Sequence, residues 1–134
     1  MIVNDANVFE AWQWQPHFRP MEFVCKHCGQ LRVDSGFMDK LFAIRAALGE
    51  PMPVTSGYRC PEHNARVSST GPKGPHTTGH AGDFSMSGEP VTRLLILSQQ
   101  MTGIGLKQHG PHRGRFVHLD DLAGDSRPRI WTYK

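Results

Sequence analysis

Long apolar runs are missing from this chain of 134 residues. The longest uninterrupted aliphatic stretch is Leu94–Leu97, whereas a helix needs about 20 apolar residues to cross a bilayer, so we expect no membrane span. A secretory signal is also missing, because Met1–Glu10 contains Asn4, Asp5 and Glu10 and has neither a basic start nor an apolar centre. We therefore expect synthesis in the cytoplasm without a signal peptide.

Cysteine is scarce, with three residues in the chain. Three thiols cannot build the dense disulfide framework of a small secreted domain, and in the cytoplasm they are more often reduced or bound to metal than paired. Internal repeats, low-complexity tracts and long linkers are missing as well. We expect a single domain over residues 1–134, with an irregular N-terminal segment over residues 1–17.

A strong excess of one charge is also absent. Fifteen Lys and Arg face twelve Asp and Glu, which gives a formal net charge of +3. This excess is too small to indicate nucleic acid, and no basic helix or aromatic platform accompanies it, so we expect no nucleic-acid partner. The basic residues late in the chain form either a solvated face or a surface that attracts anionic polymer. They are Lys107, Arg113, Arg115, Arg127 and Arg129.

Short elements of both kinds alternate irregularly along the chain. Apolar residues at helical spacing predict a helix over residues 35–48, and further helices are expected from residue 61 and over 90–101. Short strands are expected over 52–55, 81–86, 105–107 and 116–119. Because strands and helices do not alternate regularly, the pattern predicts an α+β fold, a small antiparallel sheet with flanking helices.

Histidine is abundant, with eight residues, and two of them stand in informative surroundings. His76 lies in a glycine-rich loop seven residues before Asp83, which belongs to a predicted strand. In the strand around His118, alternation places Phe116, His118 and Asp120 on one face and Val117 and Leu119 on the other. If the two strands are neighbours, Asp83 and His118 converge, and the loop can bring His76 to the same point.

Two neutral imidazoles and one carboxylate are the ligand set of a catalytic zinc ion with an open fourth position. The spacing alone is weak evidence, because a single histidine is more often a surface or hydrogen-bonded core residue than a ligand.

Three motifs occur in order along the chain. They are Ser56-Gly57-Tyr58-Arg59-Cys60-Pro61-Glu62-His63-Asn64, His76-x-x-Gly79-x-Ala81-x-Asp83 and Phe116-Val117-His118-Leu119-Asp120. Together they resemble the D-Ala-D-Ala carboxypeptidase family of zinc metallopeptidases, which includes murein endopeptidases and phage endolysins and shares its core fold with the hedgehog signalling domain. The resemblance spans about residues 18–131. It implies zinc ligation by His76, Asp83 and His118, and an Arg59 side chain that points at the site.

The general base departs from the family's pattern. Many members place a Glu or His a few residues before the last zinc-binding His, but this chain has Arg115 three residues before His118, and a guanidinium cannot accept a proton. His112, six residues before, is the nearest titratable candidate. Asp120 is the alternative, although it can instead orient a zinc-bound histidine.

A second zinc site is a separate hypothesis. Cys25-x-x-Cys28 and Cys60-x-x-His63 both have metal-ligand spacing and together supply four ligands for a structural zinc ion. The alternatives are a disulfide between Cys60 and Cys25 or Cys28 after export, or three ordinary thiols.

We expect a monomer. The resemblance implies a zinc peptidase that hydrolyses peptide stems or cross-links of bacterial peptidoglycan at a bond involving a D-amino acid. Such a protein resembles a phage endolysin, and we expect it to act in the periplasm or cell wall during phage lysis or as part of a virion. The alternative is a non-catalytic, zinc-stabilised module that binds the cell wall or belongs to the virion structure.

Overall fold

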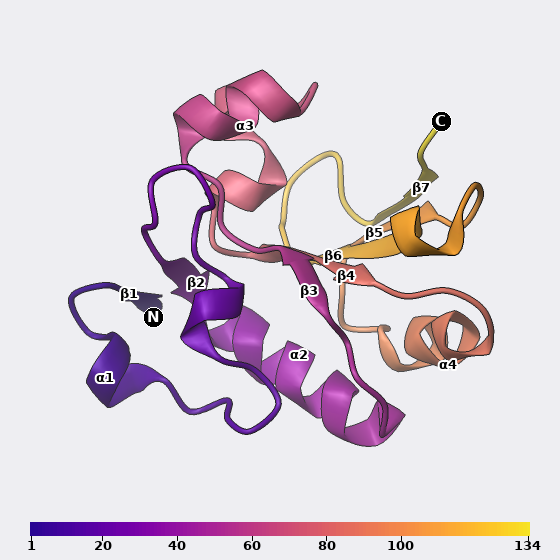
Figure 1. Ribbon diagram of the computed structural model, residues 1–134, viewed down its shortest axis with the longest axis horizontal. Helices are drawn as coiled ribbons and strands as arrows, with labels where there is room; N and C mark the ends of the chain where they lie inside the picture. Colours follow the sequence, from indigo (N-terminus) through magenta and orange to yellow (C-terminus); the bar gives the residue numbers. More distant parts are fainter.

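A five-stranded sheet forms the centre of the computed structural model, which describes residues 1–134 (Figure 1). Its strands follow the order β3 (Val54–Ser56), β4 (Ala81–Ser85), β6 (Phe116–Asp120), β5 (Gly103–Lys107) and β7 (Arg129–Thr132). All neighbouring pairs are antiparallel except β5 and β7, which are parallel. The α+β prediction is confirmed. The main sheet is mixed because β7, which follows β6 in the chain, pairs in parallel with the far edge of β5.

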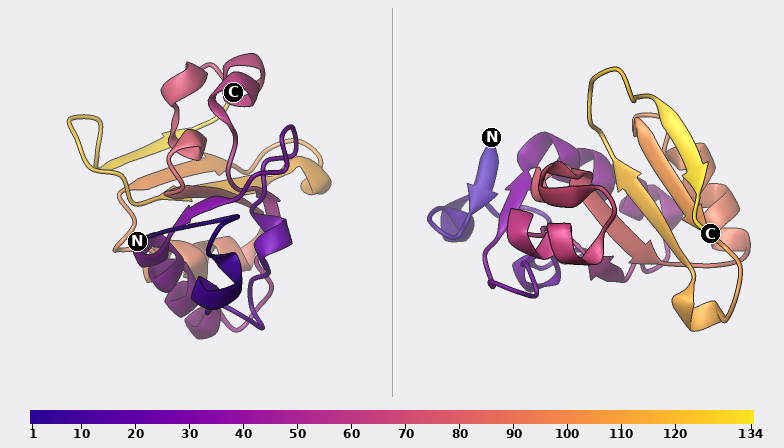
Figure 2. Two further views of the ribbon diagram at one scale, coloured as in Figure 1. Left: turned by 90° about the vertical axis from the view of Figure 1, so that its left-hand side faces the viewer. Right: turned by 90° about the horizontal axis from the view of Figure 1, so that it is seen from above.

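Helices cover the two faces of this sheet unequally. The long helix α2 (Ser35–Leu48) and helix α4 (Glu89–Leu97) lie together on one face, whereas the short helix α3 (Pro61–Val67) lies on the other (Figures 1 and 2). The face under α2 and α4 holds the hydrophobic core, to which β6 contributes Val117 and Leu119. The opposite face is left for polar side chains.

Helix α2 forms where the sequence predicts it. The Asp34 carboxylate accepts a hydrogen bond from the Phe37 N–H at the N-terminus, and Gly49 ends the helix with φ of 71°, which glycine adopts without steric cost. The residues at helical spacing are buried in the core, as expected: Phe37, Leu41, Ile44 and Leu48. Local capping and one apolar face therefore suffice to define this element.

Asp34→Ala is expected to lower the free energy of unfolding by about 1 kcal/mol, because the helix loses its N-terminal cap. Burial opposes ionisation of Asp34, but the Phe37 N–H, His80 and the N-terminal ammonium hold its pKa below its usual value. A lowered carboxylate pKa stabilises the fold above the unfolded-state pKa of about 3.9, and this contribution disappears as the pH falls through the folded-state pKa. Urea unfolding of wild type and variant should therefore differ at pH 7 and converge in acid. Asp125→Ala, at an exposed aspartate, should show no such difference.

The N-terminal segment differs from the prediction. Residues 1–17 are not irregular throughout, because β1 (Ile2–Asn4) pairs antiparallel with β2 (Arg32–Asp34) and α1 (Val8–Ala11) follows it. Val3 is fully buried in the core. The pairing partner lies about thirty residues further along the chain, so local periodicity carries no signal for it.

Smaller differences appear at the element ends. Helix α4 ends at Leu97 rather than near residue 101. At this end the Ser98 hydroxyl donates a hydrogen bond to the Leu94 carbonyl. Four short 3₁₀ helices complete the chain: η1 (Pro20–Glu22), η2 (Gly71–Lys73), η3 (Pro75–Thr77) and η4 (His112–Gly114). None of the helices has the length and apolar character that crossing a membrane requires.

Candidate metal centre and cleft

The pairing of β4 with β6 brings two predicted site residues together. These strands are antiparallel neighbours, and Asp83 stands directly opposite His118 in the register. Val117 and Leu119 point into the core, so alternation turns His118 and Asp120 to the opposite face, as the sequence predicts. The sheet register therefore fixes two of the three groups.

His76 reaches the same point from η3. Its Nδ1 lies 2.8 Å from the Gly57 carbonyl oxygen, and its own carbonyl accepts a hydrogen bond from the Arg59 N–H at 2.9 Å. The Gly57 position has no room for a side chain, because an added Cβ would lie 2.5 Å from the Phe23 Cα. The loop that holds the ring is thus pinned to the segment that carries Arg59.

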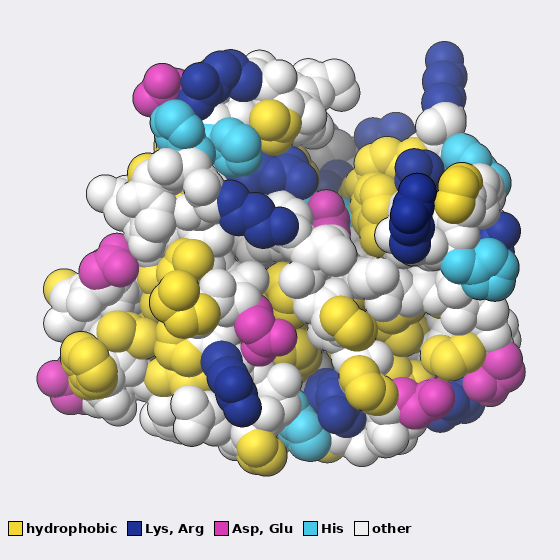
Figure 3. Space-filling model, viewed as in Figure 1, with side chains coloured by type: hydrophobic (Ala, Val, Ile, Leu, Met, Phe, Trp, Pro, Cys, Tyr) yellow, Lys and Arg dark blue, Asp and Glu magenta, His cyan; other side chains and the backbone are white.

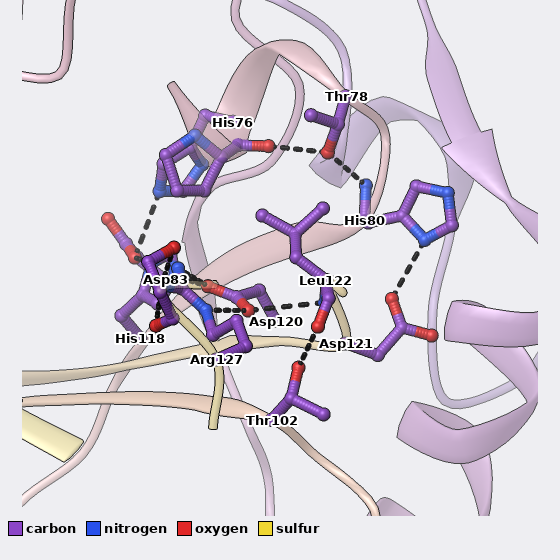
Figure 4. A network of polar contacts seen from close by, with 12 residues as sticks. His76, Thr78, His80, Asp83, Thr102, His118, Asp120, Asp121, Leu122 and Arg127 are labelled. Atoms are coloured by element: carbon purple, nitrogen blue, oxygen red, sulfur yellow. Dashed lines mark hydrogen bonds and ion pairs between the residues drawn. The ribbon is translucent and has the colours of Figure 1, made fainter. Parts of the chain in front are cut away.

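The three side chains meet at one carboxylate oxygen (Figure 4). Asp83 Oδ1 lies 3.1 Å from His76 Nε2 and 2.9 Å from His118 Nδ1. All three residues are buried, with 6%, 7% and 3% of the surface of His76, Asp83 and His118 exposed. The arrangement is therefore a closely packed polar cluster.

The other ring nitrogens define the tautomers. A carbonyl oxygen can only accept, so His76 Nδ1 carries a proton and donates it to Gly57. His118 Nε2 likewise donates to Asp120 Oδ2 at 2.8 Å. In the neutral rings, His76 Nε2 and His118 Nδ1 therefore present lone pairs toward Asp83 Oδ1. Three acceptor atoms then converge on one point, an arrangement that a cation between them stabilises.

The donor set fits zinc. Zinc binds imidazole nitrogen and carboxylate oxygen at about 2.0–2.2 Å, which separates two tetrahedral ligand atoms by about 3.3 Å. The ligand atoms of His76, Asp83 and His118 all lie within 4.8 Å of one another, and the two nitrogen–oxygen separations are 3.1 and 2.9 Å. A small outward movement of the ligand atoms would accommodate the ion and leave its fourth position open.

Asp120 contacts the side of the His118 ring that faces away from Asp83. It is fully buried, and its Oδ1 and Oδ2 accept hydrogen bonds from Arg127 Nε and Nη2 at 2.9 and 2.8 Å (Figure 4). Its Oδ2 also accepts the His118 Nε2–H, which fixes the orientation of the ring. A Cβ at Gly103 on β5 would collide with this carboxylate. Of the two roles left open for Asp120, the contacts match that of orienting the histidine.

The carboxylates of this network are held in their ionised form. Burial opposes ionisation of Asp83, but positive charge on the adjacent His76 and His118 rings holds its pKa well below the usual value; when the rings are neutral, a bound cation supplies that positive charge in their place. Burial likewise opposes ionisation of Asp120, whereas its hydrogen bonds from His118 and Arg127 lower its pKa. Both carboxylates are therefore anionic acceptors at neutral pH.

Arg59 points at the cluster, as expected. Its Nη2 lies 3.6 Å from Asp83 Oδ2, and its Nη1 donates to Asn64 Oδ1 at 3.0 Å. Asn64 is fully buried and donates in turn to Thr70 Oγ1 and to the Gly71 carbonyl. Asn64 of α3 thus holds the Arg59 guanidinium in place next to the cluster.

A cleft of about 740 Å³ opens over the cluster. Figure 3 shows the surface hollowed between α3 and the end of the chain, with Lys and Arg side chains around the hollow. Its lining includes the three clustered residues, one wall from α3 and the loop after it, and one wall from β7. Chemically distinctive lining residues are Arg59, Ser68, Ser69, Thr70, Lys73, Arg127, Arg129, Trp131 and Tyr133. Asp83 is the only carboxylate among the lining residues, so the cleft favours an anionic ligand.

His112 lies apart from this cleft. It is an exposed residue of η4 and is not among the lining residues. His80, read from the sequence as a residue at the edge of the site, pairs with Asp121 at 2.8 Å, and Asp121 also pairs with Lys40 at 2.8 Å. These contacts make His80 part of a separate, partly buried polar network.

Sequence reasoning missed several functional contacts. Arg127 was seen only as one basic residue in a late cluster, yet it holds Asp120. The Trp131 ring lies 5.2 Å from the His118 ring. Both residues come from β7 and the loop before it, a strand that the sequence did not predict. The Asn64 side chain was also missed, although it directly follows the Cys60-x-x-His63 segment.

Comparison with known proteins agrees with this geometry. A family model described as Peptidase M15 matches residues 16–120, which contain His76, Asp83, His118 and Arg59. No curated protein matches the chain.

Proposed function

Because the chain belongs to the Peptidase M15 family of zinc-dependent metallopeptidases, we propose that it hydrolyses a bond involving a D-amino acid in the peptide stems or cross-links of bacterial peptidoglycan. The observation that carries the proposal is the convergence of His76 Nε2, His118 Nδ1 and Asp83 Oδ1 at a basic cleft. The peptide stems lie in the cell wall, where we propose that the protein acts.

The site residues have three different roles. His76, Asp83 and His118 would hold the zinc ion, which when bound polarises a carbonyl group and lowers the pKa of water. The Gly57 carbonyl and Asp120 fix the two imidazole tautomers so that their lone pairs face inward. Arg59 supplies a fixed positive charge for a substrate carboxylate or for the oxyanion that develops at the attacked carbonyl.

The charge of the cleft matches the proposed substrate. Arg59, Lys73 and Arg129 line it, whereas the Arg127 guanidinium is already paired with Asp120. Peptide stems carry free carboxylates, which an excess of basic side chains attracts and orients; Arg59 lies 3.6 Å from Asp83, and Lys73 and Arg129 add further positive charge. The aromatic rings of Trp131 and Tyr133 supply apolar contact on the β7 wall.

Digestion of purified peptidoglycan tests the proposal. We expect the protein to release new amino groups or free D-amino acids, and the masses of the fragments name the bond and separate carboxypeptidase from endopeptidase cleavage. Wall preparations of several cross-link types should be compared, each with heat-inactivated protein as the control. Intact fragments from all of them, with the metal bound, would contradict the proposal.

A non-catalytic, wall-binding module is the second candidate. It is favoured by one observation: beyond His76, Asp83 and His118, the residues that line the cleft include no carboxylate or imidazole. The two functions differ in the same assay, because a binding module cosediments with insoluble wall without releasing amino groups.

His112 remains the proposed proton shuttle. It lies in η4 directly before β6, between Gly110, which has φ of 76°, and Gly114, so a movement of this loop can bring the imidazole toward the cleft. His112→Ala should then lower kcat while wall binding is retained. An unchanged kcat in the variant would assign proton transfer to another group.

Arg59→Ala is expected to lower kcat/KM by about 10²-fold, the usual effect of removing one preorganised donor at a developing oxyanion. Arg59→Lys should recover part of this loss, because it keeps the charge but not the planar fork. Arg113→Ala, at an exposed arginine outside the cleft, is the matched control and should leave kcat/KM unchanged. Equal activity of Arg59→Ala and wild type would remove Arg59 from the mechanism.

A further inference from the structure

The three cysteines of the chain form a second cluster at the base of α3. The sulfur atoms of Cys25, Cys28 and Cys60 all lie within 4.8 Å of one another, and none of them forms a disulfide. Cys25 and Cys28 come from the turn after η1, whereas Cys60 directly precedes α3. Two segments that are distant in sequence therefore present all their thiols to one point.

The turn around Cys25 and Cys28 is built to present both thiols together. The Gly29 N–H donates to the Cys25 carbonyl at 2.7 Å, and the Cys25 N–H donates to the Gln30 carbonyl at 2.8 Å. Gly29 has φ of 74°, a left-handed conformation that favours glycine. This tight turn folds the Cys-x-x-Cys pair back on itself, with the two side chains together.

A backbone hydrogen bond directs Cys60 to the same sulfur. The Cys60 N–H donates to Cys25 Sγ at 3.3 Å, and Cys25 is 1% exposed. A sulfur that accepts a hydrogen bond and lies next to two other thiols suits a thiolate bound to a cation. An apolar core contact would need neither the hydrogen bond nor the convergence.

We propose that Cys25, Cys28 and Cys60 bind a second, structural zinc ion through three thiolates. Zinc–sulfur bonds of about 2.3 Å separate tetrahedral sulfur ligands by about 3.8 Å, which the observed cluster accommodates. Cys28 is exposed and Cys60 is half-buried, so solvent reaches the fourth position. His63, the fourth ligand expected from the sequence, is not part of the cluster, and its ring stacks on His27 with 5.5 Å between the centroids.

The proposed ion would position the Arg59 segment. Arg59 directly precedes Cys60, and the Tyr58 N–H already donates to the Phe23 carbonyl at 2.9 Å. A metal ion bound by both Cys25 and Cys60 would form a second link between these two segments of the chain. The cysteine site therefore acts at a distance from the cleft, by holding the segment from which Arg59 reaches Asp83.

Cobalt substitution of the 134-residue chain tests this site without reference to peptidase activity. Thiolate ligands give Co²⁺ an intense charge-transfer absorption in the near ultraviolet, whereas histidine and carboxylate ligands do not. We expect this absorption in the wild type and its loss in Cys28→Ser and Cys60→Ser. The reciprocal control is His76→Ala, which should keep the absorption while it weakens the other centre.

Metal content and thiol reactivity complete the test. We expect about two zinc ions per purified chain and about one in Cys28→Ser, because the variant lacks one of the three thiolates that would hold the second ion. A thiol reagent should release one zinc ion as it consumes the three cysteines. A wild-type protein with no cobalt–thiolate absorption, or with a disulfide between two of the cysteines under reducing expression, would overturn the proposal whether or not the protein cleaves peptidoglycan.

Discussion

Asp83→Ala is expected to lower kcat/KM on peptidoglycan stems by about 10³-fold or more. Asp83 Oδ1 lies at the meeting point of both ring nitrogens, so its loss removes the anionic ligand and leaves two neutral imidazoles. A bound metal supplies several kcal/mol of transition-state stabilisation, and about 4 kcal/mol corresponds to about 10³-fold in rate. Release of amino groups at substrate concentrations below KM measures the effect, together with metal content.

Asp125→Ala is the matched control for this variant, because it removes an exposed aspartate outside the cleft. It should retain wild-type kcat/KM and metal content. Circular dichroism of the Asp83→Ala protein must show a folded chain for the comparison to hold. A folded Asp83→Ala protein with wild-type activity would exclude His76, Asp83 and His118 as the catalytic metal centre.

Asp120→Ala is expected to have the largest effect on stability, about 3–5 kcal/mol in the free energy of unfolding. The substitution leaves the Arg127 guanidinium, 8% exposed, without its partner, and an unpaired buried charge carries a cost of this size. The His118 Nε2–H also loses its acceptor, so metal affinity should fall by about 10–100-fold. Urea unfolding and zinc titration measure the two effects separately.

The double variant Asp120→Ala with Arg127→Met is the control for the origin of this loss. It removes the charge together with its partner, so it should recover much of the stability but not the metal affinity. Equal destabilisation of the single and double variants would show that the buried ion pair is not the cause. A single variant as stable as wild type would contradict the described network.

Part of the candidate metal centre could be predicted, because strand periodicity determines which side chains share a face of the sheet. Alternation along residues 116–120 places His118 and Asp120 on the face opposite Val117 and Leu119, and the structure confirms this division. Helix α2 was equally accessible, since its cap at Asp34 and its apolar spacing are local features. Helix α2 depends on contacts within a few residues along the chain, whereas the meeting of His118 with Asp83 also requires the pairing of β6 with β4.

The missed features depend on contacts between distant segments. β7 has only four residues, of which three are exposed, and its place in the sheet comes from parallel pairing with β5. Arg127 acquires its role only because the loop before β7 returns to Asp120. In the same way β1 is defined by pairing with β2. No local pattern distinguishes these residues from an ordinary loop.

The cysteine cluster illustrates an intermediate case. The spacing of Cys25, Cys28 and Cys60 left a shared site as one of three alternatives, and the structure brings the three thiols together; spacing alone could not determine the position of the fourth residue. His63 lies on the first turn of α3, where its ring stacks on His27. Because the His63 side chain points toward His27, the observed cluster contains three of the four ligands in the hypothesis.

The most direct test of the account is recovery of activity by zinc. The protein is treated with a chelator, assayed for release of amino groups from peptidoglycan, and assayed again after addition of zinc, with Asp83→Ala in parallel. The account predicts that chelation abolishes release, that zinc restores it in the wild type, and that Asp83→Ala stays inactive throughout. Release that continues at the full rate after complete removal of the metal would contradict the proposal of a zinc peptidase centred on His76, Asp83 and His118.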